Sequence, residues 1–251
     1  MENWYIGELI NWRINDLMKN NGLVIAIDGP AAVGKSTMGK LIAQELGFLY
    51  IDTGAIYRAI TWKVLKNNIS INDEEMISNL VSDICITIER ANNKSLNDYY
   101  HIFVDGEDVT EEIRNPRIDQ NVSQVARLPK IRKQLIYLQR KLAEKGNIIM
   151  EGRDIGSIIL PQADIKLYFT ASEEERTKRR HRELINKGYN IDYEVVKKQI
   201  MQRDKIDSKR KYAPLIKAKD AILIDSTNKN IEEVKDKILK LIKKFRECRE
   251  K

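Results

Sequence analysis

The chain has 251 residues, a length that fits one domain or one domain with large insertions. Hydrophobic residues make up 42% and charged residues 32%, so the chain can build a core and does not have a disordered composition. There are 44 Lys and Arg against 37 Asp and Glu, giving a net charge of +7. This balance suits nucleotide phosphates as well as nucleic acid, so it assigns no partner by itself.

The cysteines and the hydropathy pattern indicate in which cellular compartment the protein is expected. Cys85 and Cys248 have no CxxC partner and no His at metal-ligand spacing, so we expect no disulfide framework. No apolar run approaches the roughly 18 residues of a membrane span, so we expect no membrane association. These features together predict a cytoplasmic protein.

Residues 1–21 do not resemble a signal peptide, because charged side chains interrupt them. Their apolar residues instead follow helical spacing and predict an amphipathic helix, packed on the body of the protein or on a partner. A membrane-surface role is the weaker alternative, since the charges are mixed in sign. The apolar residues are Ile6, Leu9, Ile10, Ile14 and Leu17.

The rest of the chain alternates between short apolar runs and helical patterns. The predicted strands cover residues 23–27, 48–51, 147–150, 165–169 and 221–224. The predicted helices cover residues 35–46, 130–144, 172–187, 193–209 and 231–245. This alternation predicts an α/β fold with a parallel sheet covered by helices on both faces.

Residues 84–88 and 101–104 break this rhythm. They look like strands with no long helix between them, and Asp105-Gly106 is a strong turn pair. We expect a small antiparallel insert at about residues 80–110, outside the main sheet.

The strongest motif follows the first predicted strand. Residues 29–36 match the P-loop pattern G-x-x-x-x-G-K-[ST] between a strand and a helix, and chance gives such a match in roughly one chain in a hundred of this length. The expected ATP-binding residues are Gly29, Pro30, Ala31, Ala32, Val33, Gly34, Lys35, Ser36 and Thr37. Backbone N–H groups and the helix N-terminus would bind phosphate oxygens, Lys35 would lie between the β- and γ-phosphates, and Ser36 would bind Mg²⁺.

Several arginines favour a small-molecule kinase among P-loop proteins. A GTPase would carry Asn-Lys-x-Asp, and the nearest string, at residues 228–231, lacks the Asp. A kinase instead needs arginines that neutralise two phosphate groups. Those that occur together with the P-loop are Arg58, Arg132, Arg153, Arg176, Arg179, Arg180, Arg203 and Arg210. Glu151 ends an apolar strand, as a Walker B acid does, and could hold a water of the Mg²⁺ shell.

Five further motifs resemble the bacterial cytidylate kinases, a family of P-loop nucleoside monophosphate kinases. They are DTGAIYR at 52–58, DGEDVT at 105–110, SQVA at 123–126, EGRDIG at 151–156 and RDKIDSKR at 203–210. The likeness runs in order from about residue 23 to 245, and Glu151 stands where many members carry Asp. It implies a kinase domain over residues 22–248, with the insert as its monophosphate-binding part and a helical lid at about 172–190.

The resemblance also implies the reaction, which is ATP-dependent phosphorylation of CMP and dCMP to CDP and dCDP in pyrimidine nucleotide metabolism. It implies that the monophosphate is surrounded by Thr53, Arg58, Ser123, Arg132, Arg153, Asp154, Arg203, Asp207 and Arg210. On chemical grounds the arginines would hold the CMP phosphate. Asp154, Asp207 and Ser123 would bind base or sugar.

Catalysis is expected to come from alignment and charge neutralisation, because the acceptor phosphate is already anionic near neutral pH. The expected catalytic residues are Lys35, Arg153, Arg176 and Arg180, with Ser36 and, through water, Glu151 at the Mg²⁺. His101 and His181 are expected to be surface residues. Closure of the lid and of residues 80–130 would expel water, with Gly188 as a hinge.

Two alternatives stay open at this stage. One is a P-loop kinase acting on another monophosphate or on a small metabolite. The other is an ATP-dependent nucleic-acid-binding protein, which the net charge permits although the chain shows neither an aromatic RNA-binding motif nor a helix-turn-helix signature. We expect a monomer that binds CMP and dCMP and no nucleic acid.

Overall fold

The structure is a computed structural model that describes residues 22–90, 100–144 and 146–249, without the side chain of Arg90. These residues form two compact units. The first is Asp52–Gly146 with Arg210–Tyr212, and the second is Gly22–Ile51, Asn147–Lys209 and the chain from Ala213 onward. The amphipathic helix expected over residues 1–21 lies outside the described residues.

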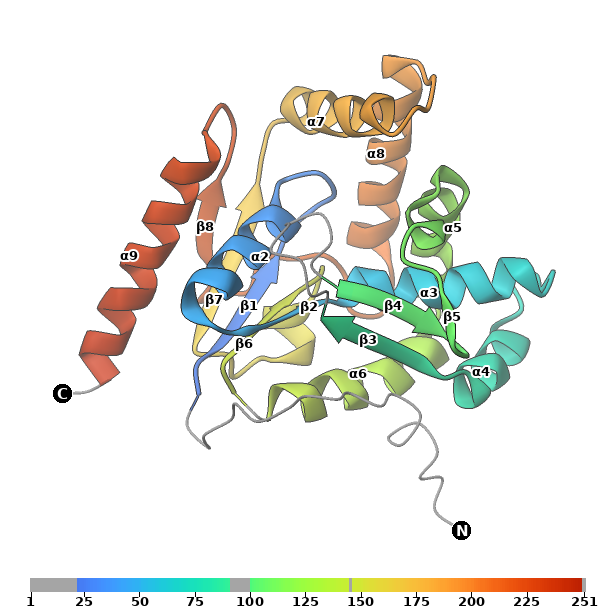
Figure 1. Cartoon of the computed structure of the whole chain (residues 1–251), viewed down its shortest axis with the longest axis horizontal. Helices are drawn as coiled ribbons and strands as arrows, with labels where there is room; N and C mark the ends of the chain where they lie inside the picture. Colours follow the sequence, from blue (N-terminus) through green and yellow to red (C-terminus); the bar gives the residue numbers. More distant parts are fainter. Residues whose placement is uncertain (1–21, 91–99, 145, 250–251) are drawn as a thin grey trace, which may run out of the picture. The chain divides into compact units, whose positions relative to one another are not determined.

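A five-stranded sheet forms the centre of the second unit (Figure 1). Its order is β2 (Leu49–Asp52), β6 (Ile148–Glu151), β1 (Val24–Asp28), β7 (Ile165–Thr170) and β8 (Ile222–Asp225). β1 pairs in parallel with β6 and β7, and β7 pairs in parallel with β8. The predicted α/β fold with a parallel sheet is therefore confirmed.

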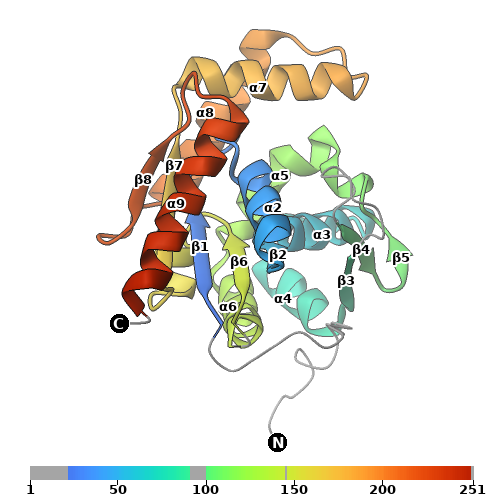
Figure 2. The same ribbon diagram turned by 60° about the vertical axis from the view of Figure 1, so that its left-hand side comes forward.

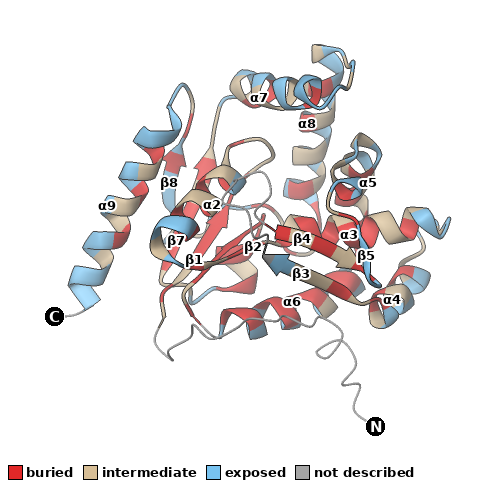
Figure 3. Ribbon diagram, viewed as in Figure 1, coloured by how far each residue is buried: buried red, intermediate tan, exposed pale blue. Residues whose placement is uncertain are grey.

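Burial explains why these strands are nearly continuous apolar runs. Ile25, Ala26, Ile27, Ile149 and Phe169 are at most 1% exposed, as expected for strands of a parallel sheet that are covered on each side (Figure 3). At the sheet edge, β8 is mostly exposed apart from Ile224. Because β1, β6 and β7 are buried, their C-terminal ends hold the start of the loops that follow them in fixed positions.

Four α-helices belong to this second unit. They are α2 (Lys35–Leu46), α7 (Glu173–Asn186), α8 (Tyr193–Lys209) and α9 (Ile231–Arg249). α2 packs on β1, β6 and α9, and α7 packs on α8 (Figure 2). α2 ends at Gly47, whose positive φ of 66° and N–H bond to Ala43 O close the last turn. All four helices were predicted, although α9 continues four residues past the expected end at 245.

The first unit combines helices with a small antiparallel sheet. The sheet has the order β3 (Ile86–Arg90), β4 (Tyr100–Val104) and β5 (Glu107–Asp108), which confirms the expected insert. Its helices are α3 (Thr53–Lys66), α4 (Glu74–Asp83), α5 (Pro116–Ala126) and α6 (Pro129–Ala143). The turn from β4 to β5 uses Asp105 and Gly106, with φ values of 52° and 82°.

Three helices of this unit, α3, α4 and α5, were missing from the expectation. Each carries a clear start signal, since Asp52, Asp73 and Asn115 accept a hydrogen bond from a backbone N–H of the first turn. α3 packs on α5 and β4, and α4 packs on α6. Among the described residues, no helix has the length and apolar character needed to cross a membrane.

Candidate functional site

The P-loop joins β1 to α2 and has the backbone that its glycines predict. Gly29 has a φ of 146°, and a Cβ added there would come 2.3 Å from Phe169 O, so only glycine fits. Gly34, with a φ of 88°, precedes the first residue of α2. A helix start of this kind offers backbone N–H groups that an anion can bind.

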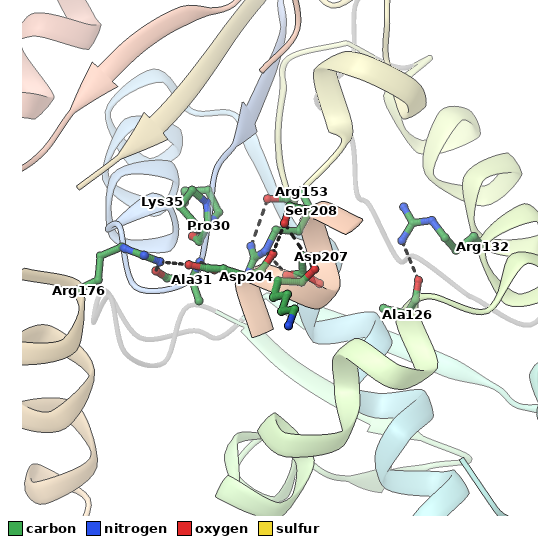
Figure 4. Close-up of polar contacts among 12 residues, drawn as sticks. Pro30, Ala31, Lys35, Ala126, Arg132, Arg153, Arg176, Asp204, Asp207 and Ser208 are labelled. Carbon is green, nitrogen blue, oxygen red and sulfur yellow. Dashed lines mark hydrogen bonds and ion pairs between the residues drawn. The ribbon is translucent and has the colours of Figure 1, made fainter. Parts of the chain in front are cut away.

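Lys35 lies at the start of α2 and is only 6% exposed. Its Nζ donates a hydrogen bond to Pro30 O at 2.7 Å, across the P-loop (Figure 4). A buried ammonium group beside converging N–H groups makes this end of β1 strongly attractive to phosphate.

A hydroxyl and a carboxylate meet next to the loop. Ser36 Oγ donates to Glu151 Oε1 at 2.6 Å, and Glu151 is 3% exposed at the end of β6. Gly39, one turn further along α2, makes room for the Tyr50 ring, because a Cβ there would lie 2.6 Å from Tyr50 Cε2. Two adjacent oxygen ligands fit Mg²⁺, which proteins bind through few side chains together with substrate phosphates.

The arginines of α7 have different partners. Arg176 is 8% exposed, forms an ion pair with Asp204 of α8, and donates to Ala31 O of the P-loop at 3.3 Å (Figure 4). Asp204 Oδ1 also accepts from Ala31 N at 3.4 Å. Arg179 pairs with Glu175 and donates to Ser226 O at 2.7 Å, whereas Arg180 pairs with Glu183 at 2.7 Å. Arg176 therefore connects α7 directly to the P-loop.

The predicted acceptor residues of the second unit lie at the end of β6 and on α8. Arg153 Nε donates to Asp207 Oδ2 at 2.9 Å, and Arg203 stands one helical turn before Asp207. Asp154 and Asp207 are each 3% exposed. The structure thus brings Arg153 and Asp207 into direct contact. The two sequence motifs that contain them do not reveal this contact.

The remaining five predicted acceptor residues belong to the first unit. Thr53 begins α3, Ser123 lies on α5 and Arg210 lies in the short 210–212 segment, and all three are at most 8% exposed. Arg132 on α6 is 1% exposed and donates to Ala126 O at 3.0 Å (Figure 4). Its guanidinium carbon also lies 5.5 Å from the centre of the Tyr57 ring.

Arg58 of α3 is the fifth of these residues. It pairs with Asp119 of α5 at 3.2 Å. Burial lowers the pKa of the Arg58 guanidinium, but the charges of Asp119 and Asp52 outweigh it and the pKa rises above its usual value. The guanidinium is therefore a fixed cation, suited to an anionic partner.

Sequence reasoning missed the carboxylates that contact the site motifs, among them Asp28, Asp119 and Asp204. Asp204 follows Arg203 directly and Asp28 precedes Gly29, so proximity to the motifs was a usable signal. Desolvation raises the pKa of Asp28 to about 6, although backbone hydrogen bonds from Gly156 and Ile155 act against it. Asp119 gives no such signal, because it is 61 residues from Arg58.

The parallel sheet, the loop after β1, the buried lysine and the strand-end acid together define a P-loop nucleotide-binding protein. The model of the cytidylate kinase family matches residues 25–244. A cytidylate kinase of Caldanaerobacter subterraneus subsp. tengcongensis is 50% identical over 227 residues, 90% of this chain and 97% of that protein. A cytidylate kinase of Geobacillus sp. (strain WCH70) is 47% identical over 225 residues, 90% of this chain and 98% of that protein. The chain belongs to the cytidylate kinase family.

Among solved structures, an uncharacterized protein from Eubacterium ventriosum is similar in fold. Its TM-score is 0.50 at 14% identity, and the match covers 89% of this chain and 99% of that one. Membership of a kinase family makes ATP the phosphoryl donor and small-molecule nucleotides the substrates.

Proposed function

We propose that the chain transfers the γ-phosphoryl group of ATP to CMP and to dCMP, giving ADP and CDP or dCDP. The observation that carries the proposal is the pair of contacts made by the motif at residues 203–210, most of which forms the last turns of α8. Asp204 of α8 contacts Ala31 and Arg176 at the donor loop, while Asp207, one turn further on, contacts Arg153. One helix therefore ties the triphosphate loop to a second group of phosphate-binding residues.

On the donor side, the proposed ATP contacts are residues 29–37. Backbone N–H groups of the loop and the α2 N-terminus bind the phosphates, and Lys35 exchanges its bond to Pro30 O for phosphate oxygens. Arg176, already at Ala31 O, neutralises charge on the transferred group together with Arg180 and Arg153.

We propose Mg²⁺ as the metal, held by Ser36 Oγ and, through a bound water, by Glu151. The 2.6 Å contact between the two side chains supports this assignment. Among the described residues no three His, Cys, Asp or Glu side chains gather as a metal site, which agrees with an ion held mainly by nucleotide phosphates. When bound, the ion supplies charge neutralisation at the β- and γ-phosphates.

On the acceptor side, we propose that CMP binds Thr53, Arg58, Ser123, Arg132, Arg153, Asp154, Arg203, Asp207 and Arg210. The buried or paired cations among them supply charge for the 5′-phosphate, and a carboxylate or hydroxyl can accept from the cytosine amino group or a ribose hydroxyl. No general base is required, because the attacking phosphate oxygen is anionic near neutral pH. The chain's part is to align the two phosphates and to neutralise them.

The proposed organisation is a kinase domain over residues 22–248. Its insert at about 80–110 belongs to the monophosphate-binding part, and residues 172–190 act as the lid. The lid segment contains α7, and Gly188 near its end has a φ of 83° that suits a hinge. We also propose that the enzyme acts as a cytoplasmic monomer without nucleic acid or membrane, which light scattering of the purified chain and RNA-binding assays at physiological salt would test.

The deciding experiment is a panel of phosphoryl acceptors with ATP and Mg²⁺. CMP, dCMP, UMP, AMP and shikimate are compared by steady-state kinetics, with ADP formation as the readout. We expect CMP and dCMP to give the highest kcat/KM. A higher value for AMP, or for shikimate, would replace the proposed acceptor with that molecule.

A further inference from the structure

Asp28 is a buried carboxylate to which the proposed reaction gives no direct part. It is the last residue of β1, is 4% exposed, and immediately precedes Gly29 of the P-loop. An ionised carboxylate in such a place is costly unless hydrogen bonds compensate for the lost water. Its position therefore calls for a specific partner.

Both oxygens of Asp28 have such a partner on a distant part of the chain. Ile155 N donates to Oδ1 and Gly156 N donates to Oδ2, each at 2.7 Å and across more than 120 residues of sequence. These two N–H groups open the π-helix Ile155–Ile159, where the helix itself leaves N–H groups unpaired. The carboxylate thus clamps the start of this helix to the end of β1.

The clamped backbone fits tightly. A Cβ added to Gly156 would lie 3.2 Å from the Lys166 side chain and 3.3 Å from Asp28 Oδ2, which is closer than ordinary van der Waals contact. The charged groups that act on Asp28 are Asp154 and Lys35, and Tyr168 of β7 also interacts with it. The clamp is therefore embedded among residues of the donor and acceptor sides.

We propose that Asp28 is a positioning residue for the acceptor side, which holds Arg153 and Asp154 at a fixed distance from the P-loop. Arg153 and Asp154 directly precede the two clamped N–H groups, and Gly29 directly follows Asp28. The Asp28 side chain therefore fixes the position of Arg153 and Asp154 relative to the P-loop. The proposal rests on the proposed acceptor role of Arg153 and Asp154.

The kinetic test uses Asp28→Asn, which keeps the shape but leaves one of the two N–H groups facing an amide NH₂. We expect the KM for CMP to rise about tenfold, the usual effect of one buried N–H left unpaired, while the KM for ATP changes little. The matched control is Asp164→Asn, because Asp164 accepts from Val24 N at 2.8 Å and clamps the other end of β1. We expect this control to leave both KM values unchanged.

A second measurement does not depend on catalysis. Amide hydrogen exchange, followed by NMR, should show slow exchange at Ile155 and Gly156 in the wild-type chain and fast exchange in Asp28→Asn. Asp164→Asn should speed exchange at Val24 instead. Equal increases of both KM values in Asp28→Asn, or rapid exchange at Ile155 and Gly156 in the wild-type chain, would overturn the proposal. If CMP fails in the acceptor panel, the exchange result still decides whether the clamp exists.

Discussion

Asp207 accepts a hydrogen bond from Arg153 Nε at 2.9 Å, and this ion pair joins α8 to the turn that follows β6. The side chains are only 4% and 18% exposed, so water screens the pair weakly. Removing one partner leaves the other charge in a poorly solvated position. Replacing Asp207 therefore tests what the pair contributes.

We expect Asp207→Asn to raise the KM for CMP by roughly thirtyfold, or about 2 kcal/mol, because Arg153 loses its charged partner. The KM for ATP should change much less. Steady-state kinetics with each substrate varied in turn will show the difference. Glu232→Gln, which removes an exposed partner of Lys235, is the control and should behave as wild type. An unaltered CMP KM in Asp207→Asn would remove this pair from the acceptor site.

Lys35→Ala should abolish measurable turnover, a loss of at least about 100-fold in kcat, because a buried cation at the donor phosphates is removed. Thermal unfolding of the variant should confirm that the fold is intact. Lys240→Ala, on the exposed part of α9, is the control. Near-normal kcat in Lys35→Ala would contradict the donor assignment.

Arg132→Met keeps the apolar volume of a side chain that is 1% exposed, but removes its charge and its bond to Ala126 O. We expect the KM for CMP to increase by at least about tenfold while the affinity for ATP stays the same. Arg127→Met, at an exposed neighbouring position, should change neither value. Arg210→Ala should give the same kind of split as Arg132→Met. Equal effects on both nucleotides would argue for a structural role.

Ser36→Ala should raise the Mg²⁺ concentration needed for half-maximal activity, because the hydroxyl that pairs with Glu151 is lost. The measurement is a Mg²⁺ titration at fixed ATP and CMP. Ser82→Ala, whose hydroxyl bonds to Ser78 O within α4, serves as the control. An identical Mg²⁺ curve for Ser36→Ala and the wild-type chain would exclude this metal ligand.

Asp28 should give the chain a measurable pH dependence of stability. Burial raises its pKa from 3.8 to about 6, so the folded state binds this proton more readily than the unfolded state does. The ionised group therefore costs stability above pH 6, and the cost is relieved as the pH falls through 6 towards 4. The full change is about 3 kcal/mol.

Urea unfolding at pH 5, 6, 7 and 8 will measure this effect. The quantity to compare is the difference in unfolding free energy between the wild-type chain and Asp28→Asn at each pH. The wild-type chain should gain relative to the variant as the pH falls. A difference that is constant with pH would show that Asp28 does not titrate in this range.

The sheet and the donor loop could be predicted from sequence because their signals are local. The P-loop glycines need their unusual backbone whatever the rest of the fold, and β1 and β7 are apolar runs because both faces are covered. α8 was predicted at its observed bounds from helical spacing alone. Each of these depends on neighbours within a few residues.

The partners of the site residues could not be predicted in the same way. Arg58 finds Asp119 on another helix, and Asp28 finds two N–H groups beyond residue 150, so both contacts depend on the folded chain. Arg176, Arg179 and Arg180 of α7 lie at the same helical spacing, yet Arg176 bonds to the P-loop and Arg180 pairs with Glu183 of its own helix. Tertiary contacts therefore determine which of these arginines reaches the P-loop, and helical spacing in the sequence does not.

The three-residue step from Asp204 to Asp207 also limits how this sequence can vary in length. A residue inserted between them would turn Asp207 by about 100° around the axis of α8, away from Arg153, while Asp204 kept its place at Ala31. A deletion would turn it by the same angle in the other direction. Natural and engineered variants of this chain should therefore reject insertions and deletions between Asp204 and Asp207.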